Sequence, residues 1–292
     1  MGATKPAVVL LASLCAWSAG AGVSASAQAV PEPEDDAVPE LELAVAGAPP
    51  AADPAAGEDD AALERAPAYA FAVGLDLYSR FLWRGVSFGE QWTLQPNASF
   101  RAYGLSVELW ASASPDQSSL VDYVGITLGY AYDAGFGTFG IRLADWIFSQ
   151  RYAEDGTLET AAPYLFDFAN DGEGSHWLDL TVFFTGPATI PITLQLGAVV
   201  YNDPDHSLYA GVLYAIDVGR GFTLTPEFGV VFGRSRRWYG TDADPVNVTN
   251  CALTVARTVE LGRGVTLPLS VALVVNPEAE RVHVVVGVGL RL

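Results

Sequence analysis

The sequence predicts an all-β fold: a transmembrane, antiparallel, up-and-down β-barrel of about twelve strands. Three observations support this fold class. From residue 68 to the end of the chain, apolar residues alternate with small or polar ones, which is typical of strands with one apolar and one wet face. The strand-like runs are longer than the strands of soluble β-domains and suit a bilayer. The connections alternate between short and long, as in bacterial outer-membrane barrels.

The first 27 residues read as a secretory signal peptide. Lys5 precedes an apolar run from Ala7 to Trp17, and small residues lead to the A-x-A site Ala25-Ser26-Ala27. Cleavage there removes Cys15 and leaves Cys251 as the one cysteine of the mature chain, which excludes an internal disulfide framework.

Residues 28–67 are predicted to be a disordered, acidic, Pro- and Ala-rich periplasmic linker. The segment holds eleven Asp or Glu residues against the single Arg65 and has no aromatic residue. It therefore buries too little apolar surface to offset the entropy of ordering the chain. The acidic balance of the whole chain, with a formal net charge of -19, excludes the basic surface of a nucleic-acid binder.

Residues 68–292 form the predicted barrel. An even strand count places both ends of the chain on the periplasmic side. The predicted strands are 68–82, 91–102, 105–114, 122–132, 137–148, 176–185, 190–201, 207–218, 222–233, 250–260, 265–275 and 281–292.

The last run shows the alternation most clearly. One face carries Val282, Val284, Val286, Val288, Leu290 and Leu292, and the other carries His283, Gly287, Gly289 and Arg291. In a membrane barrel the apolar face contacts lipid and the small or polar face lines the lumen.

The connections fit this topology. Counted from a periplasmic start, the even-numbered connections are the short, glycine-bearing YG, DAGF, GPAT, GRG and LGRG. The two longest, 149–175 and 234–249, are odd-numbered and are therefore predicted to be extracellular.

Aromatic residues cluster near the predicted strand ends, which indicates two interfacial girdles. The outer ends carry Trp83, Trp92, Trp110, Trp146, Trp177 and Trp238, and the inner ends carry residues that include Tyr130, Tyr132 and Tyr214.

The polar face predicts a lumen with charges of both signs. Such a lining is typical of a selective aqueous path, and equally of a small barrel closed by salt bridges. The predicted lumen-lining residues are Asp76, Tyr78, Arg80, Arg101, Glu108, Arg142, Asp179, Asp217, Glu227 and His283.

One segment resembles a known family. Phe81-Leu82-Trp83-Arg84-Gly85-Val86-Ser87, followed by Pro96 in the next strand, resembles the opening of the TorF-like family of outer-membrane porins, whose first hairpin carries an aromatic-R-G-[VI]-S segment. The similarity is clear over residues 73–114. It implies a barrel that acts as a porin, although this chain ends in Leu292 where many barrels end in Phe.

No catalytic residue, metal site or cofactor is predicted. A lipid hydrolase would use Ser175 and His176, but adjacent strand residues point to opposite faces and share no proton directly. The acidic stretches Asp203-Pro204-Asp205, Asp242-Ala243-Asp244 and 167–173 fit solvated loops or cation bridges to lipopolysaccharide.

The sequence thus predicts a narrow porin or solute channel in the bacterial outer membrane. Its 23 acidic and 13 basic barrel residues indicate a preference for cations. Expected partners are outer-membrane lipid and lipopolysaccharide, the barrel assembly machinery, and small solutes or ions, but no nucleic acid. The alternatives are a barrel with a closed lumen that serves a structural or surface-interaction role and, less favoured, the lipid hydrolase.

Overall fold

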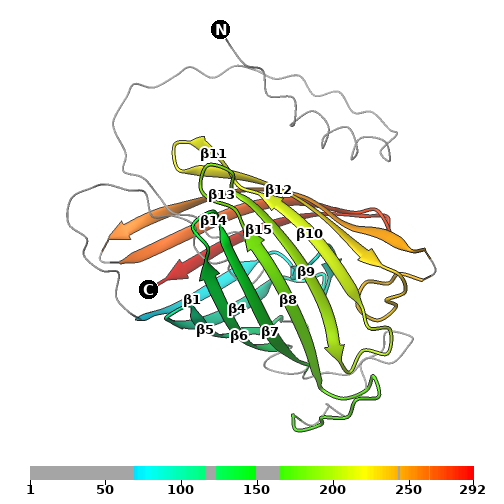
Figure 1. Cartoon of the computed structure of the whole chain (residues 1–292). Coiled ribbons are helices and arrows are strands. Elements are labelled where there is room, and N and C mark those ends of the chain that lie inside the picture. Colours follow the sequence, from blue (N-terminus) through cyan, green and yellow to red (C-terminus); the bar gives the residue numbers. More distant parts are fainter. Residues whose placement is uncertain (1–68, 116–122, 149–164, 243, 263) are drawn as a thin grey trace, which may run out of the picture. The chain divides into compact units, whose positions relative to one another are not determined.

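The structure, a computed structural model, describes residues 69–115, 123–148, 165–242, 244–262 and 264–292. Within these ranges the regular elements are strands, and they close into an antiparallel barrel (Figure 1). No helix among the described residues is long and apolar enough to cross a membrane. The predicted signal peptide (1–27) and linker (28–67) lie outside the described residues and stay predictions.

Twelve strands make up the barrel wall, as the sequence predicts. In chain order they are β1 (Tyr69–Tyr78), β4 (Thr93–Ala102), β5 (Leu105–Ser112), β6 (Tyr123–Asp133), β7 (Thr138–Phe148), β8 (His176–Thr185), β9 (Ile192–Tyr201), β10 (Leu208–Tyr214) continued by β11 (Ile216–Gly219), β12 (Phe222–Phe232), β13 (Val246–Gly262), β14 (Val265–Asn276) and β15 (Arg281–Arg291). Each strand pairs with its neighbour in the chain, and β1 pairs with β15 to close the ring. β10 and β11 both pair with β12, so they form one interrupted strand.

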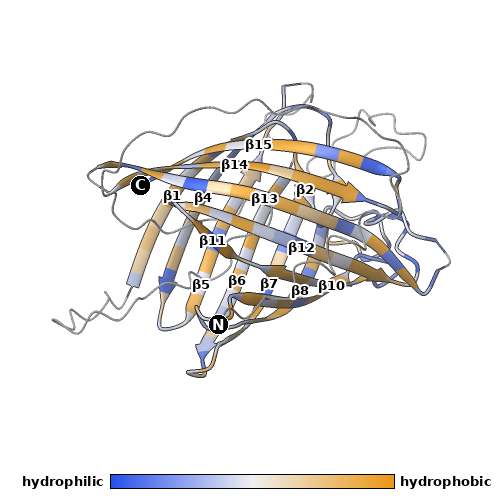
Figure 2. Cartoon of the chain, turned by 90° about the horizontal axis from the view of Figure 1, so that it is seen from above, coloured by the Kyte–Doolittle hydropathy of each residue, from blue (hydrophilic) through white to orange (hydrophobic). Residues whose placement is uncertain are grey.

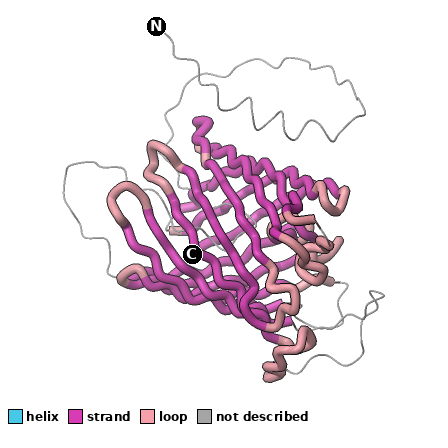
Figure 3. The backbone as a smooth tube through the Cα atoms, turned by 45° about the vertical axis from the view of Figure 1, so that its right-hand side comes forward, coloured by secondary structure: helices cyan, strands magenta, loops and turns pink. Residues whose placement is uncertain are grey.

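The two ends of the barrel differ in their connections (Figure 3). Residues 103–104, 134–137, 186–191, 220–221 and 263–264 connect strands at one end, which we name the turn end. The opposite end carries the connections 79–92, 202–207, 233–245 and 277–280 together with the described residues 113–115 and 165–175, and we name it the loop end.

The predicted faces of the last strand are confirmed. Val282, Val284 and Val286 on β15 are 65%, 59% and 52% exposed, whereas His283 is 8% exposed. Apolar residues recur along the strands of the wall (Figure 2). The outward side chains form an apolar band far larger than the patches that water-soluble monomers expose, as expected for a surface in contact with lipid.

Three predicted strands differ from the observed ones, two at a boundary and one by an interruption. The first strand ends at Tyr78 rather than at residue 82, because the chain leaves the wall there and forms the small hairpin β2 (Leu82–Trp83) and β3 (Val86–Ser87). β13 begins at Val246 rather than at residue 250. A bulge at Gly229/Val230 shifts the register of β12 and lets residues 246–248 pair with it. The predicted strand 207–218 is interrupted at Ala215, between β10 and β11.

The exposure of β15 gives a test of the lipid-facing band. Replacing Val286 with Arg is expected to lower the free energy of unfolding by about 2–4 kcal/mol, because the charge then lies near the middle of the apolar band. The matched change of Val282, at the end of the strand, should cost only about 0–1 kcal/mol. Denaturant unfolding in lipid vesicles measures both values. Equal losses at the two positions would argue against a membrane-spanning wall.

Candidate functional site

The connection between β1 and β4 enters the lumen of the barrel. We name residues 79–92 the inserted hairpin. At its tip, Asn276 on β14 donates a hydrogen bond from Nδ2 to the carbonyl oxygen of Gly85 (3.1 Å). Gly85 has φ +83°, and a Cβ atom at this position would lie 1.9 Å from the carbonyl oxygen of Thr249 on β13. Both the conformation and the close approach therefore require glycine.

The side chain of Arg84 extends from the tip of the inserted hairpin to β8, away from the contacts of Gly85 with β13 and β14. Its Nη1 donates to Oδ2 of Asp179 on β8 (2.8 Å) and to the hydroxyl of Tyr239 (2.9 Å), and its Nη2 donates to Oγ1 of Thr181 (2.9 Å). Thr181 in turn donates to the other carboxylate oxygen of Asp179 (3.0 Å). The side chains of Arg84 and Asp179 are only 9% and 4% exposed, so the ion pair is buried.

Aromatic rings enclose the same guanidinium group. Its Cζ lies 4.3 Å from the ring centre of Trp83 and 4.7 Å from that of Tyr209. Tyr239 stacks on both of these rings. Arg84 therefore gains cation–π attraction in addition to its charged hydrogen bonds, in a place where water does not compete.

These groups belong to a larger apolar assembly, which we name the lumen cluster. Its buried members are Trp83, Trp177, Val199, Tyr209, Val231, Trp238 and Tyr239, with Phe81, Val86, Phe88, Trp146 and Phe148 packed against them. A pocket of only about 10 Å³, which is room for a single water molecule, lies between the inserted hairpin, β7, Tyr123 and Trp238. On β9, a Cβ atom at Gly197 would lie 2.5 Å from Nη2 of Arg84, so glycine leaves the room that the guanidinium fills.

The inserted hairpin also has polar contacts with other strands. Tyr123 on β6 donates its hydroxyl hydrogen to the carbonyl oxygen of Phe88 (3.2 Å). Arg80 pairs with Glu90 (2.8 Å) and lies 2.9 Å from Nδ1 of His283 on β15. The hairpin thus spans the lumen from wall to wall instead of lying along one side.

The charge states of Arg84 and Tyr239 follow from burial and from the groups that surround them. Burial by itself would lower the pKa of Arg84, but Asp179 and Tyr239 outweigh burial and raise it above its usual value. Burial raises the pKa of Tyr239 despite the opposing effect of Arg84. Arg84 therefore stays charged and Tyr239 stays neutral, which suits their hydrogen bond.

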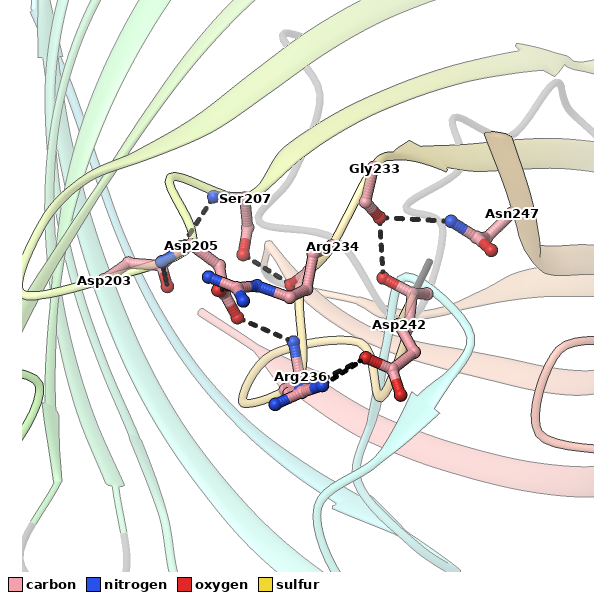
Figure 4. A network of polar contacts seen from close by, with 10 residues as sticks. Asp203, Asp205, Ser207, Gly233, Arg234, Arg236, Asp242 and Asn247 are labelled. Atoms are coloured by element: carbon pink, nitrogen blue, oxygen red, sulfur yellow. Dashed lines mark hydrogen bonds and ion pairs between the residues drawn. The ribbon is translucent and has the colours of Figure 1, made fainter. Parts of the chain in front are cut away.

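A second loop, residues 233–245, supplies Trp238 and Tyr239 to the lumen cluster. Figure 4 shows how this loop is anchored to the connection 202–207. Asp205 accepts hydrogen bonds from Nε of Arg234 (2.6 Å) and from the backbone nitrogen of Arg236 (2.9 Å). Ser207 and Ser235 share a hydrogen bond between their hydroxyl groups. We use the name plug for the inserted hairpin together with this loop.

The predicted lumen residues lie in three environments. Near the loop end, Asp179 binds Arg84, Arg80 contacts His283, and Glu227 accepts a hydrogen bond from Asn250 (2.8 Å). On β1, Asp76 receives a two-pronged ion pair from Arg291 (2.7 and 2.9 Å), two residues before the half-buried Tyr78. Arg101, Glu108 and Arg142 border one cavity at the turn end.

The structure places Asp217 differently. This residue is exposed in the hairpin between β11 and β12 and accepts a hydrogen bond from the backbone nitrogen of Gly219 (2.7 Å). It therefore caps a turn at the barrel rim and does not border a path through the lumen.

The prediction of Trp83 as a girdle residue is wrong. Trp83 is 5% exposed, and the outer-end residues Trp177 and Trp238 are equally buried in the lumen cluster. Trp110 and Trp146 also turn inward, in contact with each other and with Phe81 and Trp83. The alternation contained this signal, because Trp110 shares a face with Glu108. The other predicted girdle residues have exposed side chains: Trp92, Tyr130, Tyr132 and Tyr214.

His176, the candidate base of the hydrolase alternative, has another role. Its Nδ1 lies 2.9 Å from Oδ2 of Asp145 and its Nε2 lies 2.7 Å from the carbonyl oxygen of Leu165, while the ring of Phe168 stacks on it at 3.9 Å. Both ring nitrogens are engaged by acceptors, so neither is placed to take a proton from a serine. Within the described ranges, no group of three or more His, Cys, Asp or Glu residues is arranged to hold a metal ion.

Comparison with known proteins shows similarity in structure only. No protein-family model matches the sequence, and no curated protein matches it, so the TorF-like resemblance stays a prediction. Solved structures with a similar arrangement include an outer membrane channel from Pseudomonas putida F1 (TM-score 0.44, 11% identity, 80% of this chain and 99% of that chain covered). The translocator domain of the autotransporter NalP from Neisseria meningitidis is also similar (0.33, 11%, 78% and 89%). A third similar structure is the outer membrane channel DcaP of Acinetobacter baumannii (0.32, 7%, 76% and 94%).

The buried ion pair gives a prediction for stability. Replacing Asp179 with Asn leaves the charge of Arg84 uncompensated and should lower the free energy of unfolding by about 3–5 kcal/mol. The control is Arg236→Gln, which breaks the ion pair with Asp242. Both of these side chains are mostly exposed (66% and 68%), so solvent screens the pair and its loss should change the free energy of unfolding far less. Denaturant titration followed by tryptophan fluorescence measures both. A loss at Asp179 no larger than that at Arg236 would contradict the role given to the pair.

Proposed function

We propose that this protein is a solute channel of the outer membrane whose lumen is closed at the loop end by the plug. The observation that supports the proposal is that connections between strands supply many of the side chains that fill the lumen. Half of the side chains of the lumen cluster come from two connections, residues 79–92 and 233–245, and the other half come from wall strands, which border a cavity of about 260 Å³ at the turn end. A plug borne by loops can move without breaking the hydrogen-bond ladder of the wall.

The outer-membrane location rests on the physical character of the wall. A closed barrel with an apolar outer band satisfies every wall strand without an exposed edge, which is the requirement for a sheet in lipid. We propose that the band contacts lipid, that the loop end faces lipopolysaccharide, and that the barrel assembly machinery inserts the chain.

We further propose a preference for cations when the channel is open. Exposed acidic residues at the loop end include Asp171, Asp242, Asp244, Glu278 and Glu280. Arginines 234, 236 and 237 pair with part of the acidic set. The remaining excess of negative charge concentrates cations within about 10 Å at 0.1 M salt.

A second candidate function is a closed, structural or surface-interaction barrel. The specific observation in its favour is the tight packing of the lumen cluster, which leaves a pocket of only about 10 Å³ between the inserted hairpin, β7, Tyr123 and Trp238. The two candidates differ in whether the plug can leave the lumen.

Planar-bilayer recordings separate the two candidates. Arg84→Gln removes the ion pair, and Gly85→Ala puts a methyl group against the backbone of β13 while keeping every charge. Both variants should raise the mean conductance at least tenfold over the unchanged protein, because both weaken the contacts that hold the inserted hairpin against the barrel wall. The control Arg220→Gln, an exposed arginine in a turn-end hairpin, should conduct as the unchanged protein does. Folded variants that pass no current would establish the closed barrel instead.

The ion preference is measured in the Gly85→Ala background, which retains all native charges. A tenfold KCl gradient at low salt should give a reversal potential on the cation-selective side, and the selectivity should fall as salt rises. The double change Glu278→Gln and Glu280→Gln should reduce it. Anion selectivity at low salt would contradict this proposal and assign the preference to the lumen arginines Arg80, Arg101 and Arg142.

A further inference from the structure

Arg257 is a charged residue on the apolar outer face of the barrel wall. It lies in the last third of β13, directly opposite Phe222 on β12 and Leu269 on β14. Both of these partners are exposed on the outside of the barrel. Its neighbours in the chain, Ala256 and Thr258, are buried on the lumen face. Directly opposed residues share one face of a sheet, so the side chain of Arg257 points away from the lumen.

This orientation distinguishes Arg257 from the other basic residues of the wall. The chain has one lysine, Lys5, which lies in the predicted signal peptide. The other arginines on the described strands face the lumen: Arg101 and Arg142 border the turn-end cavity, Arg291 binds Asp76, and Arg281 shares the face of His283. Arg257 is therefore the one arginine or lysine that the described strands direct towards the outside.

The guanidinium group of Arg257 has no polar partner within the described ranges. Its Nε is buried without a hydrogen-bond acceptor, and no described carboxylate pairs with the group, whereas Arg84 and Arg291 each bind one. Glu260, three residues further along β13, falls on the opposite face because side chains alternate along a strand. Because a buried donor without an acceptor lowers stability, the position favours an acceptor from outside the chain. The nearest outward positions are apolar and include Leu224, Val255, Val259 and Leu267.

Phe222 fixes the place of this guanidinium group. The centre of its ring lies 5.0 Å from Cζ of Arg257, within the range of a cation–π attraction. Phe222 is the first residue of β12 and directly follows the connection 220–221 at the turn end. A long arginine side chain near the end of a membrane strand reaches the level of the lipid headgroups while its aliphatic stem stays on the apolar wall.

We propose that Arg257 and Phe222 form a binding site for the phosphate group of a phospholipid in the leaflet at the turn end. The guanidinium presents a fork of N–H donors that matches two phosphate oxygens, and the negative charge of the phosphate compensates the arginine. The acyl chains of the lipid lie along the exposed apolar residues Leu253, Val255 and Val271. The site rests on the proposed membrane location, but not on conduction through the lumen.

Titration of lipid into the purified protein, followed by native mass spectrometry, tests the proposal. The probe is dimyristoylphosphatidylglycerol in a neutral maltoside detergent, and the control lipid is dimyristoylglycerol, which has the same acyl chains but no phosphate. The phospholipid should bind about tenfold more tightly or better, because only it offers charged acceptors to the arginine. Arg257→Gln should abolish this difference. Arg281→Gln, which removes an exposed arginine at the loop end, should change the affinity for the phospholipid less than about twofold.

Two further variants separate the parts of the site. Arg257→Lys keeps the charge but loses the fork of donors, so it should bind the phospholipid with intermediate affinity. Phe222→Leu keeps an apolar side chain but loses the cation–π contact, and it should also be intermediate. Circular dichroism shows whether each variant keeps the barrel.

Equal binding of the two lipids, or an equal loss of affinity with Arg281→Gln, would overturn the proposal. Displacement of the lipid by the soluble headgroup glycerophosphoglycerol at the same concentration would assign the site to a solute instead. A dimer that Arg257→Gln converts to a monomer would assign Arg257 to contact with a second copy of the chain. Flotation with liposomes distinguishes these failures from failure of the proposed location, because a barrel that lacks the phosphate site still floats with vesicles and a water-soluble protein does not.

Discussion

The structure depends on one buried ion pair inside the barrel, between Arg84 of the inserted hairpin and Asp179 of β8. Each of the two charges is stable at its buried position only with the other, because an unpaired buried ion lowers the stability of the fold by several kcal/mol. The pair therefore fixes where the hairpin stops, and with it the positions of Trp83 and Gly85 on either side. The rings that stack around the guanidinium then fill the loop end. A barrel wall alone would leave that volume to water.

The strands of the barrel wall could be predicted from the sequence because the pattern that identifies them lies within each strand. Alternation of apolar and polar residues assigns each side chain to a face without knowledge of its neighbours, and β15 follows this rule along its length. The plug could not be predicted in this way. Arg84 and Asp179 are 95 residues apart and Arg84 and Tyr239 are 155 apart, so no periodic pattern connects them. The segment 81–87, which carries the family resemblance, reads as a strand end and is in fact the tip of the plug.

The candidate site was predicted in part for the same reason. Face alternation assigned Asp76, Glu108, Arg142 and Asp179 to one face of the wall, but it gave no information about which charges meet, such as Asp76 with Arg291 or Asp179 with Arg84. Proximity to strand ends led to the prediction of a tryptophan girdle at the outer rim. A tryptophan at a strand end can face lipid or lumen, and for Trp146 the decisive fact is its alignment with Arg142 and Ala144 on the inner face.

The inserted hairpin has a consequence for how the barrel is built. It connects the first two wall strands, yet its partners lie on β8, β13 and β14, and β1 also forms the closing seam with the last strand. Contacts of such large sequence separation carry a loop-closure cost that slows folding. The first wall strand therefore bears two long-range constraints, one in the seam itself and one through the connection that follows it across the lumen.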